Sequence, residues 1–341
     1  MSIRISLIII TITSILFFLL NIALGSIYIP LKDVIEILFG KESDPESWAI
    51  IINKSRLPQA LTAMLAGAGL AVSGLQMQTL FRNPLADPSI LGVSSGAGLG
   101  VALVLMAGGF GGIAISALGI FGYLTVTVAA LSGAMSVLFV LLLLSRRLLN
   151  NATLLIAGIM IGYIAASLIS ILKFYGMKED VHSFVIWGLG SFSAVSWSKM
   201  QVFCPSILIG LLCSFLLIKP LNVLSLGENY AKNLGINVKR SRFLILLITG
   251  FLTSVITAFC GPIAFLGLAV PHLTRGLLHT SNQRTLVPAV MILGAALALF
   301  CNLIARMPGF DGALPINAVT GIIGAPIVIW VIVKKSRFYS N

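Results

Sequence analysis

The sequence predicts an all-α integral membrane protein with about ten transmembrane helices. Of its 341 residues, 58% are hydrophobic and only 9% are charged, and the mean hydropathy is +1.07. Uncharged runs of about 20 residues, the length at which a helix crosses a bilayer, recur along the chain. Basic residues gather in alternate connections between these runs. The three observations together exclude a soluble domain of this length.

Six runs each have the length of one span. They are Ile5 to Leu24, Leu57 to Phe81, Leu148 to Leu172, Met200 to Ile218, Thr285 to Ala305 and Gly312 to Val333. The first run follows a short, weakly basic start and has no small-residue cleavage site. We therefore expect it to remain as a span and not to be removed as a signal peptide.

Two longer uncharged runs each hold more than one crossing. The run from Pro88 to Ser145 contains a glycine-rich cluster at 108–112, which predicts a turn between two helices. The run from Phe243 to Thr274 is interrupted at Gly261 and again at Pro271, which predicts one full helix and one short, broken helix. These four helices bring the expected total to ten.

The distribution of Lys and Arg predicts which side of the membrane each connection faces. With both termini in the cytoplasm, the internal segments hold fourteen basic and two acidic residues, which is the entire net charge of +12. The external segments hold eight of each and cancel. The positive-inside rule accounts for this pattern, so the basic character of the chain does not indicate nucleic-acid binding.

The residues that would drive or catalyse a reaction are missing from the pattern. No Asp, Glu, Lys or Arg falls within the core of a predicted span, which argues against an ion-driven secondary transporter. No phosphate-binding loop of the G-x-x-x-x-G-K-[ST] type occurs, and no nucleophile, base or metal-ligand cluster is apparent. We predict a non-enzymatic protein without cofactor or metal, whose energy comes from a separate ATPase.

A docking surface for that ATPase is predicted in the longest polar cytoplasmic stretch, at about 222–236. A short helix should begin at Ser225 as N-cap and end at Gly235 as C-cap, with one apolar stripe. A helix lying on lipid headgroups is the alternative interpretation. The predicted coupling residues are Leu226, Gly227, Glu228, Tyr230, Ala231, Leu234 and Gly235.

Several motifs, in a fixed order along the entire chain, resemble the FecCD family of permeases. They are Arg56–Pro58, Gly67–Gln78, Arg82–Pro88, Leu91–Ala97, Leu226–Gly235, Gly261–Leu268, Pro271–Arg275, Leu314–Ile316 and Gly324–Pro326. The resemblance implies the type II ABC importer permease (BtuC-like) fold as a single domain over residues 1–341. It also implies that helices 2 to 5 and 7 to 10 are inverted repeats.

The resemblance further implies an assembly in the bacterial inner membrane. Two permeases, identical or homologous, would pair and form a pathway along their shared axis. Two cytoplasmic ATPase subunits would bind below, and a periplasmic or lipoprotein substrate-binding protein above. The cargo expected from the family is a ferric siderophore, with cobalamin and haem as alternatives.

Family gate positions fall on two polar segments of this chain. Asn83 and Leu85 would line an inner cytoplasmic gate, although the segment from Arg82 to Pro88 is also explained as a rigid turn with an Arg82–Asp87 pair. Asn150 and Asn151 would form the main cytoplasmic gate. A helix cap is the alternative for this amide pair.

Two external arginines at span ends, Arg56 and Arg306, match family positions that receive acidic side chains of the binding protein. Snorkelling to the membrane interface is the alternative. A further arginine that the resemblance implies three residues after Arg56 is Gln59 here, which weakens that contact, and Lys54 would have to substitute for it.

Overall fold

The computed structural model describes residues 3–25, 27, 29–38, 40, 46–106, 120–148, 150–307 and 313–339. Throughout these residues the regular structure is helical. The turn predicted at 108–112 lies outside the described residues. Ten helices correspond to the ten predicted spans. These are α1 (Ile3–Ala23), α4 (Leu57–Phe81), α5 (Val93–Met106), α6 (Ile120–Arg147), α7 (Asn151–Tyr175), α9 (Trp197–Leu216), α12 (Val238–Cys260), α13 (Leu266–Leu278), α14 (Gln283–Ala305) and α15 (Ile316–Tyr339).

Seven helices of the described chain are long and apolar enough to cross a membrane, and α5 and the Ile316–Trp330 part of α15 add shorter apolar helices. The predicted break in the second long run is confirmed, because α12 ends at Cys260 and α13 begins only at Leu266. Gly261 has φ +75°, a conformation that favours glycine, and it ends α12.

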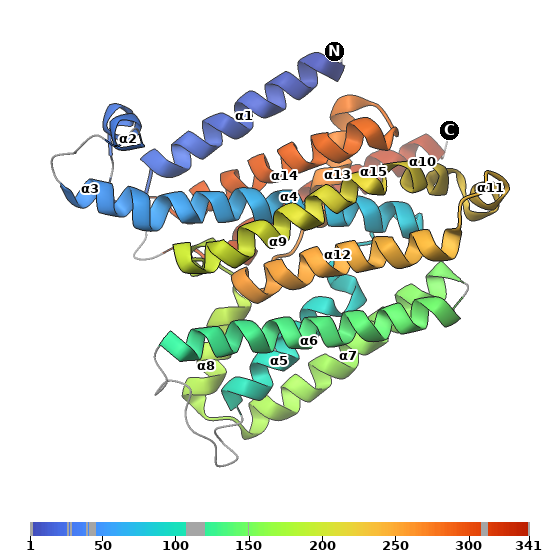
Figure 1. The fold of residues 1–341 in the computed structure, drawn as a ribbon, viewed down its shortest axis with the longest axis horizontal. Coiled ribbons are helices and arrows are strands. Elements are labelled where there is room, and N and C mark those ends of the chain that lie inside the picture. Colours follow the sequence, from blue (N-terminus) through green and yellow to red (C-terminus); the bar gives the residue numbers. More distant parts are fainter. Residues whose placement is uncertain are drawn as a thin grey trace.

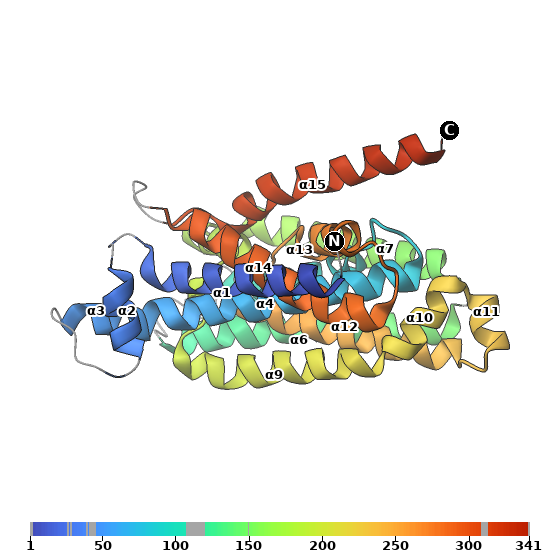
Figure 2. The same cartoon turned by 90° about the horizontal axis from the view of Figure 1, so that it is seen from above.

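The long helices lie side by side along one common direction (Figures 1 and 2). One end of the bundle carries α10 (Ile218–Leu226) and α11 (Glu228–Asn233), and is called the α11 end. The opposite end carries α2 (Leu31–Leu38) and α3 (Glu46–Ile51), and is called the α3 end. The chain begins and finishes toward the α11 end, as expected for an even number of spans.

Helix α4 forms the centre of the bundle, and almost all of its side chains are buried against α9, α12, α13 and α14. Two glycines permit this packing. A Cβ at Gly67 would lie 2.3 Å from the carbonyl oxygen of Gly294 in α14, and a Cβ at Gly74 would lie 1.9 Å from that of Gly267 in α13. Small residues therefore bring these backbones into contact, the usual basis of helix association in membranes.

Short helices connect the spans. A π-helical turn (Ile52–Arg56) joins α3 to α4, and 3₁₀ turns lie at Pro88–Leu91 and Phe192–Ala194. Helix α8 (Lys178–Gly188) lies between α7 and α9 at the α3 end (Figure 1).

Candidate functional site

The predicted coupling segment folds as two short helices that meet at a corner. The single helix expected from Ser225 to Gly235 is wrong, because α10 continues to Leu226 and α11 starts only at Glu228. Gly227 lies between them with φ +122°, where other residues are strained. The Ser225 hydroxyl donates to the carbonyl oxygen of Asn222 at 2.6 Å and does not cap a helix.

The end of α11 is stopped as the sequence predicted. Gly235 has φ +76°, its N–H bonds to the carbonyl oxygen of Lys232, and the N–H of Ile236 bonds to that of Ala231. This pair of bonds is the Schellman motif, which a glycine after the last helical turn favours. Ala231 is buried and anchors the short helix.

The apolar stripe of the coupling segment faces outward. Leu226, Tyr230 and Leu234 are 61%, 66% and 61% exposed. Three large apolar side chains exposed at one helical corner form a surface suited to contact with another molecule.

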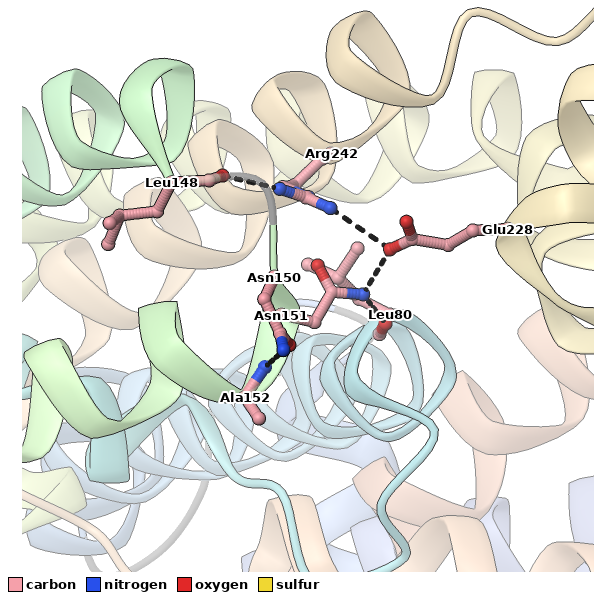
Figure 3. Close-up of polar contacts among 7 residues, drawn as sticks. All are labelled: Leu80, Leu148, Asn150, Asn151, Ala152, Glu228 and Arg242. Atoms are coloured by element: carbon pink, nitrogen blue, oxygen red, sulfur yellow. Dashed lines mark hydrogen bonds and ion pairs between the residues drawn. The ribbon is translucent and has the colours of Figure 1, made fainter.

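Glu228, in contrast, points into the protein. Its Oε1 accepts a hydrogen bond from Arg242 Nη2 at 2.9 Å and from Asn151 Nδ2 at 2.7 Å (Figure 3). Arg242 is only 3% exposed, and its Nη1 donates to the carbonyl oxygen of Leu148 at 2.9 Å. Asn151 Nδ2 also donates to the carbonyl oxygen of Leu80 at 2.8 Å. One carboxylate thus links α11, α12, the start of α7 and the end of α4.

The structure separates the two predicted gate asparagines. Asn150 Oδ1 accepts from the N–H of Ala152 at 2.8 Å, so Asn150 is the N-cap of α7 (Figure 3). Asn151 is the residue that contacts Glu228. The capping alternative therefore describes Asn150 but not its neighbour.

A groove of about 690 Å³ joins the two predicted sites. It is lined by Phe81, Arg82, Asn150, Asn151, Ala152 and residues 226–230. Gate residues and coupling residues, which are far apart in the sequence, therefore share one hollow at the α11 end.

The second predicted gate segment lies next to this groove. Asn83 Oδ1 accepts from the N–H of Leu85 at 2.9 Å, and the Leu85 side chain is exposed. The Arg82–Asp87 pair suggested by the sequence is not formed. Asp87 is buried and accepts from both the N–H and the hydroxyl of Ser89, whereas Arg82 lies beside Gly227. Burial raises the pKa of Asp87 above its ordinary value.

The broken helix α13 is fastened to α4 and to the loop after it. Arg275 Nη1 donates to Gln78 Oε1 at 2.7 Å, and His272 Nε2 lies 2.8 Å from the carbonyl oxygen of Pro84. These contacts could not be predicted from the local sequence, because they join positions almost 200 residues apart.

Asn317, at the start of α15, is a further residue that sequence reasoning missed. Its side chain accepts from the N–H of Ala264 at 2.9 Å and donates to the carbonyl oxygens of Pro262 at 2.6 Å and Gly188 at 3.3 Å. One amide thus holds together α15, the α12–α13 break and the end of α8. Nothing in the local sequence distinguishes this asparagine from a cap.

At the α3 end, Arg56 is held inside the protein. It is 1% exposed, and its guanidinium donates to the carbonyl oxygens of Ile22 at 2.8 Å, Ala23 at 2.7 Å and Ile27. Of the two alternatives, snorkelling to the interface is therefore wrong for Arg56.

Arg306 lies close to Arg56, since both guanidinium groups flank Gly25. Burial and the neighbouring Arg56 charge lower the pKa of Arg306 to about 10. Among the residues that the structure describes, neither arginine forms an ion pair with a carboxylate. Within the described part of the chain, the pair is therefore a concentration of positive charge without a carboxylate partner.

Gln59, which replaces a family arginine, belongs to a buried amide chain beside this pair. Its Nε2 donates to Asn302 Oδ1 at 3.0 Å, Asn302 Nδ2 donates to Asn21 Oδ1 at 2.7 Å, and Asn21 Nδ2 donates to the carbonyl oxygen of Leu299 at 2.9 Å. This row of amides fastens α1 to α4 and α14, so the Gln59 side chain contributes to helix packing.

A family model decides the identity of the fold. The model of the FecCD transport family matches residues 12–334. This chain belongs to the FecCD transport family. It is an ABC importer permease of the BtuC type, which confirms the resemblance drawn from the sequence motifs.

Curated relatives and solved structures agree. The vitamin B12 import system permease proteins BtuC of Salmonella typhi and Salmonella newport are each 37% identical over 285 residues, covering 83% of this chain and 83% of each relative. An ABC transporter classed as of the metal-chelate type, in an inward-facing conformation, superimposes with a TM-score of 0.81 at 30% identity, covering 96% of this chain and 98% of that one. PsaBC from Streptococcus pneumoniae, at 16% identity and a TM-score of 0.53 over 80% of this chain and 89% of that one, shares the fold alone.

Proposed function

We propose that this chain carries a large metal chelate inward across the bacterial inner membrane as one of two paired permeases, powered by separate ATPase subunits. The observation that carries this proposal is the linkage of Glu228, Arg242 and Asn151, because it joins an exposed helical corner directly to the first turn of a spanning helix. A stand-alone transporter would have no use for such a corner.

The exposed stripe of α10 and α11 supports ATPase docking. Leu226, Tyr230 and Leu234 present apolar surface to a partner, and Gly227 with Gly235 sets the shape of the corner. Glu228 does not contact the partner in this proposal. It transmits the displacement of α11 to Asn151, because the two side chains share a 2.7 Å hydrogen bond.

The gate follows from the same connection. When α11 moves, Asn151 either moves with Glu228 or loses its hydrogen bond to Glu228. In both cases the hydrogen bond from Asn151 to the carbonyl oxygen of Leu80 in α4 changes its geometry. We assign the main gate to the start of α7 with Asn150 and Asn151. The neighbouring Asn83 and Leu85 form the inner gate, supported by the groove that separates α4 from α7.

Pairing of two permeases is supported by the exposed face of α7. Its large side chains at Ile156, Met160, Tyr163, Ile164 and Leu168 are exposed although the helix is one of the most apolar in the chain. We propose that this face meets a second copy or a homologous permease. The α11 end then faces the cytoplasm, which agrees with its excess of basic residues.

The arginine pair at the α3 end supports docking of a binding protein. Arg56 and Arg306 place two guanidinium groups around Gly25 without a carboxylate among the described residues, so an acidic side chain of a partner would complete the site. Arg56 keeps its carbonyl partners in this proposal. The acidic side chain contacts Arg306, which is the more accessible of the two, and the charge of Arg56 adds to the attraction.

The cargo is proposed as a large metal chelate, with cobalamin as the first candidate. The sequence alone favoured ferric siderophores. The relatives that import vitamin B12, at 37% identity, now favour cobalamin, and siderophores and haem follow it. The exposed large side chains of α7 from Ile156 to Leu168 carry no charge, so this face does not favour tight retention of a specific cargo.

Coupling is tested with the permease and its ATPase together in lipid nanodiscs. We expect Leu234→Lys to abolish ATPase binding and Glu228→Gln to leave binding intact while loosening the link between ATP hydrolysis and transport. Asn233→Lys is the matched control, because it adds the same charge one residue away from the stripe. Normal transport by both Leu234→Lys and Glu228→Gln would contradict the proposal.

The cargo is tested by uptake in cells that carry the permease, its ATPase and its binding protein. Radiolabelled cyanocobalamin, ferric siderophores and haem are compared with and without vanadate. Vanadate-blocked uptake of one compound identifies the cargo. Uptake that resists vanadate and stops with an uncoupler would overturn the importer mechanism.

A further inference from the structure

A cluster of four exposed basic side chains lies where α6 ends and α12 begins. The two helix ends lie together at the α11 end of the bundle (Figures 1 and 2). The Arg146 guanidinium sits 5.0 Å from the centroid of the Phe243 ring, so the last turn of α6 contacts the first turns of α12.

The α12 residues of the cluster share the face of Phe243. Lys239 and Arg240 precede Phe243 by four and three residues, so they lie one turn farther toward the helix end on the same side. Arg147 adjoins Arg146 on α6, and all four basic side chains are exposed. The group of Arg146, Arg147, Lys239 and Arg240 is called the basic patch.

The acidic residues of this end are already engaged elsewhere. Glu228 pairs with Arg242, and Asp87 is buried with Ser89. Within the part of the chain that the structure describes, no carboxylate pairs with any member of the basic patch. The patch therefore attracts negative charge from outside the chain.

An apolar stripe leads directly to the patch. On α6, Phe139 and Leu143 are exposed and are spaced by four residues, and Arg147 follows after four more. On α12, exposed Leu247 stands one turn behind Phe243. The side chains therefore change from apolar to basic within one helical turn, as they do where a lipid-facing surface reaches the headgroup layer.

We propose that the basic patch binds the headgroup phosphate of an anionic phospholipid, whose acyl chains lie along the Phe139–Leu143 stripe. The continuity of the stripe with the patch favours a lipid over an acidic protein surface, because a soluble partner would not need the apolar continuation. The proposed ATPase contact, in contrast, uses the separate stripe on α10 and α11. This inference does not depend on the cargo or the ATPase, because lipid binding is measured on the permease alone.

The test uses the purified full chain in detergent and native mass spectrometry. Phosphatidylglycerol and phosphatidylcholine with identical acyl chains are offered in equal amounts. We expect the native chain to retain phosphatidylglycerol preferentially. Lys239→Gln with Arg240→Gln should reduce that preference by about tenfold or more, since each base near an anionic surface contributes roughly a fivefold effect.

The matched control removes two other exposed bases at the same end. Lys219→Gln with Arg284→Gln takes the same charge from α10 and α14, and should preserve the preference. Equal retention of both lipids by the native chain, or an equal loss in the control, would overturn the proposal. So would a patch variant that keeps phosphatidylglycerol and loses the ATPase in a lipid-free pull-down, because the patch would then belong to the partner.

Discussion

Two buried arginines at opposite ends of the molecule are stabilised in different ways. Arg242 at the α11 end pairs with Glu228 and donates to the carbonyl oxygen of Leu148, so its charge is balanced inside the chain. Arg56 at the α3 end is bound by carbonyl oxygens and lies beside Arg306. Carbonyl groups satisfy the donors of a guanidinium but do not neutralise it. The charge of Arg242 is therefore balanced by Glu228, whereas no carboxylate among the described residues balances Arg56 and Arg306.

Removing Arg242 should have the largest effect on this contrast. Arg242→Gln leaves the Glu228 carboxylate without its cation and the Leu148 carbonyl without its donor. We expect a loss of about 3 kcal/mol in the free energy of unfolding. The measurement is denaturant unfolding in detergent, with Arg240→Gln as the exposed control. A loss no larger than that of the control would show that the pair is not structural.

Replacing Arg56 should cost less. Arg56→Gln removes hydrogen bonds to carbonyl oxygens, but it leaves no carboxylate of the described residues without its partner, and it relieves the repulsion with Arg306. We expect a loss of about 2 kcal/mol, measured in the same unfolding experiment. If Arg56→Gln were the more damaging of the two replacements, carbonyl ligation would be the stronger means of holding a buried arginine.

An acid placed between the outer arginines should make the α3 end resemble the α11 end. A Cβ at Gly25 would lie 3.0 Å from Arg56 Nη2 and 3.2 Å from Arg306 Nη2, so Gly25→Asp brings a carboxylate to both groups. We expect affinity for the binding protein to fall about tenfold, equivalent to about 1.4 kcal/mol. Gly25→Ala is the control for the added Cβ. Unchanged affinity in Gly25→Asp would remove the arginine pair from the docking surface.

The smallest effect should be the pH dependence of Arg306. Its pKa of about 10 in the folded chain lies below the ordinary value of an arginine, so the folded state releases this proton at a lower pH than the unfolded state. The charged group therefore destabilises the fold below about pH 10, and stability recovers as the pH rises above that value. Arg306→Gln should be more stable than the native chain by under about 1 kcal/mol at neutral pH, because partial exposure screens the charge. The difference should shrink at about pH 11, and a constant difference across this range would contradict the assignment.

Much of the candidate site was predictable because it depends on local chemistry. Gly235 stops α11 as expected, since a glycine after an amphipathic turn is favoured in the left-handed conformation. Ser225 misled the prediction of the helix start. Its pattern matches a capping box, but Gly227 interrupts the helix two residues later, and the backbone of Gly227 is set by the corner between α10 and α11.

The sequence by itself determined that this chain crosses a membrane about ten times, which connections carry the basic charge, and that it belongs among the FecCD permeases. Hydrophobic length and motif order are properties of contiguous residues. Only the tertiary structure decided that Glu228 faces Asn151 and Arg242, that Arg56 is enclosed, and that Asn317 joins three helices. These contacts depend on how the spans pack, because a polar side chain buried among helices bonds to whichever partner the packing brings within reach.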